Sequence, residues 1–150
     1  LHDYAGALMR QGDLDRAEPL ALEAVDVERS LGGPDGVGTG VTTGQLAEIL
    51  RRKGALTEAE SMYAESLRIL RAAFPETHPR VLGMRSGAAL TMGQLGRWEA
   101  AEPLLLEVHE QATAVEDGGT AARSAAQALV RYYEARGDTV QAAQWREAMN

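Results

Sequence analysis

The chain has 150 residues, of which 45% are hydrophobic, 5% are aromatic and 25% are charged, and its net charge is −7. These are the values of a globular protein, and the length suits one domain better than two. The acidic balance argues against nucleic acid as the main partner, because neutralising phosphates requires a surplus of Lys and Arg.

The composition also limits the possible fold classes and cellular locations. Cysteine is absent, which excludes disulfides, thiolate metal sites and a cysteine nucleophile and favours a cytoplasmic location. No apolar run approaches the roughly 18 residues that span a bilayer, so we expect no membrane contact. Because aromatic residues are scarce, Leu, Ala, Val and Met must fill the core, which favours an all-helical fold. The chain begins at Leu1 rather than Met, and we expect it to be the C-terminal part of a longer protein.

A glycine turn recurs four times along the chain. The glycines Gly12, Gly54, Gly96 and Gly137 are separated by 42, 42 and 41 residues. A small residue lies five positions after each glycine and another lies seven positions before it; these are Ala17, Ala59, Ala101 and Ala142, and Ala5, Ala47, Ala89 and Val130. Small residues at matched places let two consecutive helices approach closely, as an antiparallel hairpin requires.

Each repeat is therefore predicted to contain a first helix, a glycine turn, a second helix and a connecting loop. The first helices are expected at about 1–11, 37–53, 79–95 and 119–136, and the second helices at 13–31, 55–73, 97–117 and 138–150. The repeats are 1–33, 37–74, 79–117 and 119–150, within a single domain that spans 1–150. Each turn glycine is expected to adopt a positive φ, and Asp13 and Asp138 are expected to cap the helices that follow.

The segments Arg10–Leu20 and Gln94–Leu104 resemble the tetratricopeptide repeat (TPR). The period near 42 residues and the loop from Phe74 to Val81 are similar to the kinesin light chain variety of that repeat, which is widespread in bacteria. The resemblance implies an all-α fold, a right-handed α-solenoid of about four helical hairpins, which binds proteins or peptides and is not an enzyme. The paired asparagines of the family's first helices are missing, since Asn150 is the only asparagine.

A second functional hypothesis comes from the end of the chain. The segment from Leu129 to Arg146 resembles the last repeat of bacterial serine/threonine kinases that carry such repeats after the kinase domain. The alternative is therefore a regulatory or oligomerising segment of a larger enzyme.

Three other patterns are interpreted as structural. The glycine-rich stretch 32–40 lacks the spacing of a phosphate-binding loop and occupies the position of a loop between repeats, where its many glycines predict mobility. His2, His78 and His109 lie in three different repeats, so no metal site is expected. Trp98 and Trp145 are expected to pack between neighbouring helices. We predict no catalytic residue and no cofactor.

The resemblance implies that the first helices line a concave groove. The predicted first helices hold nine basic and three acidic residues, whereas the predicted second helices hold six basic and seventeen acidic ones. An acidic protein would thus present a basic groove, and the expected partner is a protein or peptide with an acidic segment; self-association stays open.

By the geometry of the family, the positions six, three and two before each turn glycine face this groove. The predicted binding residues are Met9, Arg10, Glu48, Arg51, Arg52, Leu90, Gln94, Arg131 and Glu134. Arg51, Arg52 and Arg131 are the expected principal contacts, with Arg10 at the edge. Gly6 and Gly93 are expected to leave room for a ligand backbone, and Met9 and Leu90 to offer apolar contact.

Overall fold

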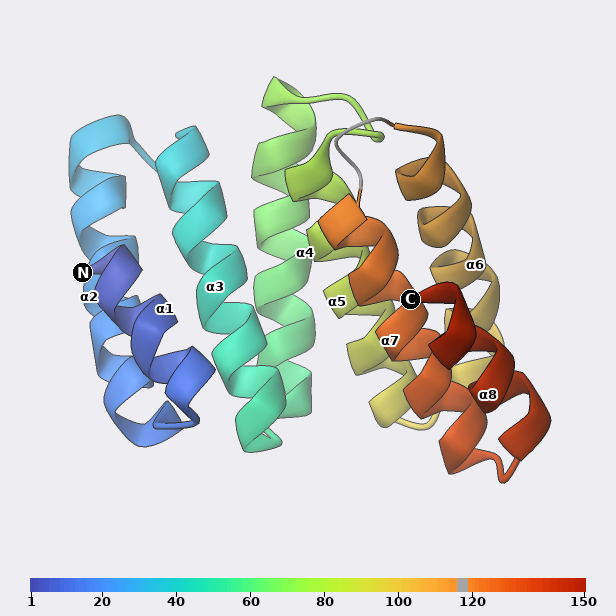
Figure 1. Cartoon of the computed structure of the whole chain (residues 1–150). Helices are drawn as coiled ribbons and strands as arrows, with labels where there is room; N and C mark the ends of the chain where they lie inside the picture. Colours follow the sequence, from blue (N-terminus) through green and yellow to red (C-terminus); the bar gives the residue numbers. More distant parts are fainter. Residues whose placement is uncertain (116–118) are drawn as a thin grey trace. The chain divides into compact units, whose positions relative to one another are not determined.

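The computed structural model describes residues 1–115 and 119–150, and every regular element within these ranges is an α-helix (Figure 1). The helices are α1 (His2–Gln11), α2 (Leu14–Gly32), α3 (Val37–Lys53), α4 (Leu56–Ala73), α5 (Pro79–Gln94), α6 (Trp98–Ala114), α7 (Gly119–Ala135) and α8 (Thr139–Ala148). The predicted bounds agree within about two residues, except at the end of α6. Helix α6 ends at Ala114, and residues 116 and 117 of the predicted span lie outside the described residues.

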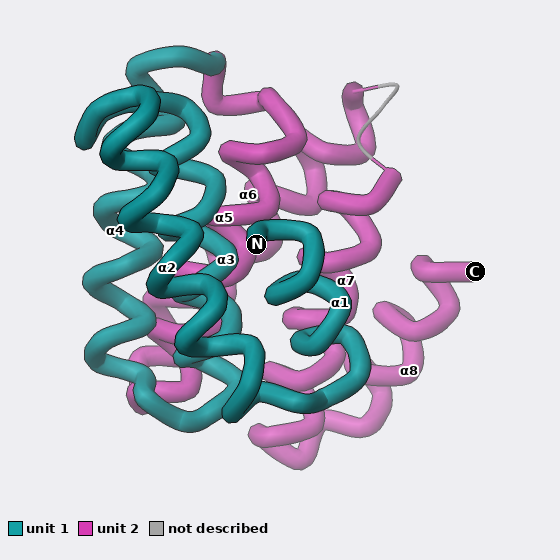
Figure 2. Tube along the Cα trace, turned by 90° about the vertical axis from the view of Figure 1, so that its left-hand side faces the viewer, with its two compact units in different colours: residues 1–74 teal, residues 75–150 magenta. Residues whose placement is uncertain are grey.

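The helices form two compact units, residues 1–74 and residues 75–150 (Figure 2). The first unit contains the hairpins α1–α2 and α3–α4, with α2 packed on α3. The second contains α5–α6 and α7–α8, with α6 and α5 both packed on α7. Each unit is thus a pair of stacked hairpins with a core of its own.

The glycine turns that close the hairpins have the predicted conformation. Gly12, Gly54, Gly96 and Gly137 have φ values of 84°, 86°, 93° and 74°, the left-handed region that favours glycine. The predicted caps also form, because the carboxylate of Asp13 accepts a hydrogen bond from the backbone N–H of Arg16 at 3.3 Å, and that of Asp138 accepts one from Gln141 at 3.1 Å.

The alanines that define the repeat are buried where the two helices of each hairpin touch. Ala5, Ala17, Ala47, Ala59, Ala89, Ala101 and Ala142 are all at most 1% exposed. Small side chains at these crossings let the helices approach closely, and Leu, Ile and Val fill the layer between hairpins. Helices α2 and α6 continue through Pro19 and Pro103, both of which are exposed.

Much of the glycine-rich stretch 32–40 belongs to helices rather than to a loop. Helix α2 extends to Gly32 and α3 begins at Val37, so only residues 33–36 connect them. The hydroxyl of Thr39 donates to the carbonyl of Gly33 at 2.8 Å, and a Cβ on Gly40 would lie 2.8 Å from the side chain of Ile69 in α4. The loop interpretation therefore holds for four residues, and Gly40 serves close helix packing.

Candidate functional site

The predicted binding residues lie on the C-terminal halves of the four first helices, α1, α3, α5 and α7. The first unit holds those on α1 and α3, and the second holds those on α5 and α7. The two units are described in turn.

The centre of the predicted site in the first unit is a cluster of four residues, Glu48, Arg51 and Arg52 of α3 and Tyr63 of α4, here called the Glu48 cluster. Oε1 of Glu48 accepts hydrogen bonds from Nη2 of Arg51 at 2.6 Å and from Nε of Arg52 at 2.7 Å. Oε2 accepts from Nε of Arg51 at 3.0 Å and from the phenol of Tyr63 at 2.5 Å. The carboxylate is thus held by four donors from two helices.

These donors determine the charge state of Glu48. Burial opposes ionisation of the carboxyl group, but the hydrogen bonds and the positive charge of Arg51, with further bonds from Tyr63 and Arg52, outweigh it and lower the pKa of Glu48 to about 2. Burial also raises the pKa of the Tyr63 phenol, and the neighbouring Glu48 carboxylate raises it further. At neutral pH the cluster therefore contains one anion, two cations and a neutral phenol.

The cluster changes the expected role of Arg51. The sequence predicts that Arg51 and Arg52 both flank a ligand, yet Arg51 is only 6% exposed whereas Arg52 is 43% exposed. Adjacent residues point about 100° apart around a helix, so when Arg52 faces solvent Arg51 turns toward α4. Its guanidinium then needs a buried counter-charge, which Glu48 provides one turn earlier. Arg52 is the surface residue of the pair.

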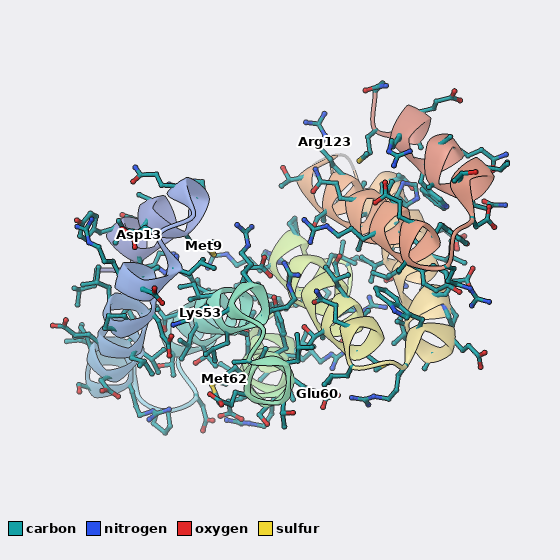
Figure 3. The ribbon with its side chains drawn as sticks, turned by 90° about the horizontal axis from the view of Figure 1, so that it is seen from below. Met9, Asp13, Lys53, Glu60, Met62 and Arg123 are labelled. Atoms are coloured by element: carbon teal, nitrogen blue, oxygen red, sulfur yellow. The ribbon has the colours of Figure 1, made fainter. Side chains whose placement is uncertain are left out.

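The predicted residues of α1 occupy different environments. Arg10 is exposed, and Met9 is half-buried against the core of the first unit (Figure 3). The room expected beside Gly6 is filled, because a Cβ there would lie 2.8 Å from Nε2 of Gln45, which donates to the carbonyl of His2 at 3.1 Å. Gly6 therefore makes space for a neighbouring side chain and not for a ligand.

In the second unit, α5 presents less of the predicted surface than expected. Leu90 is buried in a cluster with Ala89, Leu105, Ala128 and Leu129. A Cβ on Gly93 would overlap the six-membered ring of Trp98, so the indole occupies the space that the sequence assigns to a ligand backbone. Trp98 packs inside the second unit, as predicted. Of the three predicted residues of α5, Gln94 alone is exposed.

Helix α7 keeps an exposed basic residue at its predicted position. Arg131 is exposed, and within residues 1–115 and 119–150 it forms no ion pair. Glu134, one turn later, forms an ion pair with Arg146 of α8. The negative charge of Glu134 is thus engaged by the second helix of its own hairpin, and Arg131 stays available to solvent.

Sequence reasoning did not anticipate a set of links between successive repeats. The carboxylate six positions after a turn glycine bonds the end of the next first helix: Glu18 accepts from Nζ of Lys53 at 2.6 Å, and Glu102 accepts from the phenols of Tyr132 at 2.7 Å and Tyr133 at 2.5 Å. Figure 3 shows Lys53 on the side of α3 that faces α2. The recurring Glu-Pro pairs at 18–19 and 102–103 were the available signal.

The charges separate between the two classes of helix. Within the described helices, the first helices carry eight basic and three acidic side chains, and the second helices carry five basic and thirteen acidic ones. Arg85 is not part of a free basic surface, because its guanidinium donates to Gln111 at 2.6 Å and lies 3.4 Å from the carboxylate of Glu107. The exposed cations of the predicted site are Arg10, Arg52 and Arg131.

Comparison with known proteins identifies the architecture. Residues 1–72 match the tetratricopeptide repeat family. The crystal structure of BtubC (BKLC) from P. vanneervenii is similar to 97% of this chain and 59% of its own, with a TM-score of 0.71 and 25% identity. A Podosopora anserina protein with nearly identical TPR-like repeats of the kinesin light chain kind covers 99% of this chain and 71% of its own, with a TM-score of 0.75 and 20% identity. No curated protein sequence matches.

Residues 1–72 therefore match the tetratricopeptide repeat family, the chain as a whole has the fold of solved structures with repeats of the kinesin light chain kind, and the predicted all-α fold class is confirmed. It spans about three fifths of the length of BtubC. Within the described ranges, no helix is both long and apolar enough to cross a membrane, and no three His, Asp or Glu side chains converge as metal ligands would.

Proposed function

We propose that this protein is a binding scaffold without catalytic activity, and that the exposed basic side chains on the first helices of each unit bind acidic protein segments. The observation that carries the proposal is the exposure of Arg10, Arg52 and Arg131 on first helices, while most acidic residues lie on second helices. Arg10 and Arg131 form no ion pair with any described side chain, so their charges are not neutralised internally. We propose further that the four repeats act as one TPR domain.

Arg52 and Arg131 are the main contacts in this proposal. Arg52 uses its Nε to hold Glu48, which leaves the rest of its exposed guanidinium for a ligand carboxylate. Arg51 donates two hydrogen bonds to the same Glu48 carboxylate and so helps to hold Arg52 in position. Partly exposed contacts of this kind contribute about 0.5–1.5 kcal/mol each, so the affinity is micromolar and falls as the salt concentration rises.

Apolar contact at the edge of this surface comes from one residue of α1. Met9 is half-buried beside Arg10. Of the two residues predicted to offer apolar contact, Met9 alone is partly exposed, because Leu90 is buried in the core of its unit. A flexible thioether fits varied apolar side chains. The ligand is therefore an acidic segment with an apolar residue next to its carboxylates.

The test uses a fluorescent peptide of about twelve residues in which Glu and Asp alternate with Leu, followed by anisotropy. Arg52→Glu in the first unit and Arg131→Glu in the second should each weaken binding to its own unit by about threefold to tenfold, and the double variant should weaken binding to both units. Arg29→Glu, the same charge change on the exposed surface of α2, is the matched control. Equal weakening by the control would mean that only the net charge matters, and unchanged binding by the folded double variant would refute the site.

A further inference from the structure

The second unit has a hollow where α6 begins and α7 ends. A cavity of about 480 Å³ is lined by Gly96, Arg97, Trp98, Glu99, Ala100 and Arg136. All of these residues belong to one unit, and none of them is among the predicted binding residues of the first helices. The volume falls within the range of roughly 300–1,000 Å³ that is usual for ligand pockets, so the hollow can hold more than a bare inorganic ion.

The corresponding junction of the first unit is closed by ion pairs. Lys53 stands one position before its turn glycine, as Arg136 does. Nζ of Lys53 lies 3.0 Å from the carboxylate of Asp15 and 2.6 Å from that of Glu18, both on the preceding second helix. The charge of Lys53 is thus neutralised by the repeat before it.

Aromatic side chains change this junction in the second unit. The carboxylate of Glu102, which matches Glu18, accepts hydrogen bonds from the phenols of Tyr132 and Tyr133. Nη1 of Arg136 donates to the phenol of Tyr132 at 2.7 Å, and its guanidinium lies 5.4 Å from the centre of that ring. Within residues 1–115 and 119–150 Arg136 forms no ion pair, so its charge is not neutralised as that of Lys53 is.

The wall of the hollow carries a net positive charge. Arg97 is exposed at the position where the first and fourth repeats have Asp13 and Asp138. Arg97 and Arg136 place two guanidinium groups on this wall, against the single carboxylate of Glu99. The hollow therefore attracts an anionic group, and guanidinium groups bind carboxylates through paired hydrogen bonds.

Trp98 adds an apolar wall to the hollow. Its indole is half-buried and packs against the ring of Tyr132, with 5.2 Å between the ring centroids. Aromatic rings pack favourably on other rings, and Trp is enriched where proteins bind one another. A ligand that fills this hollow therefore carries a ring next to its carboxylate.

We propose that this hollow binds an acidic residue and a neighbouring aromatic residue from a segment of a partner protein. Arg97 and Arg136 hold the carboxylate, and Trp98 packs against the ring. The site is separate from the basic surface of the first helices, which depends on Arg52 and Arg131, so either site can fail without the other.

Trp98 allows binding to be followed at the hollow itself, because the chain has two tryptophans and Trp145→Phe removes the other one. The probe is the blocked peptide acetyl-Gly-Glu-Phe-Gly-amide, titrated into the intact chain that carries Trp145→Phe and followed by fluorescence. We expect a saturable change in the emission of Trp98. The same peptide with Gln in place of Glu, or with Ala in place of Phe, should bind at least about fivefold more weakly, and inorganic phosphate should leave the emission unchanged.

Substitutions in the wall should change binding in opposite directions. Arg97→Glu should weaken it by about fivefold and Arg136→Gln by about threefold, whereas Glu99→Gln should strengthen it by about twofold because a charge that repels the ligand is lost. Arg123→Glu, at an exposed position near the start of α7 (Figure 3), is the matched control and should change binding by less than about twofold. Arg131→Glu should have as small an effect.

Arg97 and Arg136 are exposed, so their variants are expected to keep the circular dichroism spectrum of the parent. The indole N–H signal of Trp98 in the NMR spectrum of the unsubstituted protein provides a second measurement. Unchanged binding by folded Arg97→Glu and Arg136→Gln would overturn the proposal. Equal weakening by Arg123→Glu or Arg131→Glu would also overturn it, and so would a response to phosphate as large as the response to the peptide.

Discussion

Glu48 and Arg51 form an ion pair one helical turn apart on α3, with 2.6 Å between Oε1 of Glu48 and Nη2 of Arg51. The guanidinium is almost completely buried, and the phenol of Tyr63 completes the shell of donors around the carboxylate. A buried cation that loses its partner is left with an uncompensated desolvation cost, so the pair is a sensitive point of the first unit.

Glu48→Gln should lower the free energy of unfolding at pH 7 by about 3 kcal/mol, because Arg51 would remain buried without a counter-charge. Urea denaturation monitored by circular dichroism measures this change. Glu58→Gln, at an exposed position of α4, is the control and should change stability by less than about 0.5 kcal/mol. Similar stability of the two variants would mean that water reaches Arg51.

The ion pair between Glu48 and Arg51 also predicts how the stability of the protein depends on pH. The pKa of Glu48 is lowered to about 2 from a usual value of 4.5, so its contribution is complete above pH 4.5 and is lost as the pH falls toward 2. The stability difference between the parent and Glu48→Gln should therefore shrink by about 3 kcal/mol over this interval. Denaturation curves at several pH values provide the measurement, and a constant difference would contradict the lowered pKa.

Gly93→Ala should destabilise the second unit by about 2 kcal/mol, because the added methyl group overlaps the ring of Trp98 and forces the indole to move. Gly83→Ala is a matched control on the same helix. Nothing lies within 4 Å of a Cβ at Gly83, so this change should stabilise α5 by about 0.5–1 kcal/mol. Thermal unfolding of both variants tests the pair, and changes of the same sign would show that Trp98 does not occupy this space.

Tyr133 should ionise unusually late. Burial and the hydrogen bond to the Glu102 carboxylate raise the pKa of its phenol to about 12. Because this pKa lies above the usual value of 10, the associated stability is complete below pH 10 and is lost as the pH rises through 12. NMR titration of carbon-labelled tyrosine follows the phenol directly. Glu102→Gln should lower its pKa, whereas Glu99→Gln, at an exposed position of the same helix, should not.

The helices and turns could be predicted from the sequence because they depend on residues that each have one dominant physical role. Gly12 and Gly54 need a left-handed turn and Ala17 and Ala59 need a close crossing, so the helices could be placed from spacing alone. The site was harder to predict because it depends on side-chain direction. Arg51 turns inward because Tyr63, at a position where other second helices have Ala21 or Leu105, brings a phenol to the same carboxylate.

The pairing of a glycine at position 93 with a large ring at Trp98 was visible in the sequence, but the sequence analysis assigned the space beside Gly93 to a ligand backbone. Three positions before the other turn glycines stand Met9, Arg51 and Glu134, and two positions after them stand Leu14, Leu56 and Thr139. Only the third repeat combines glycine at the first position with tryptophan at the second. Because these positions meet across the turn, a large ring on one helix requires an absent side chain on the other.

The left-handed glycine turns also constrain how such a chain can change its length during evolution. A duplication or loss of about 42 residues returns every turn glycine and every crossing alanine to an equivalent place. A change of another length within a hairpin rotates the following helix by about 100° per residue and exposes its buried stripe. Genes of this kind therefore grow and shrink by whole hairpins, and each new copy arrives with its turn glycine and its crossing alanine already encoded.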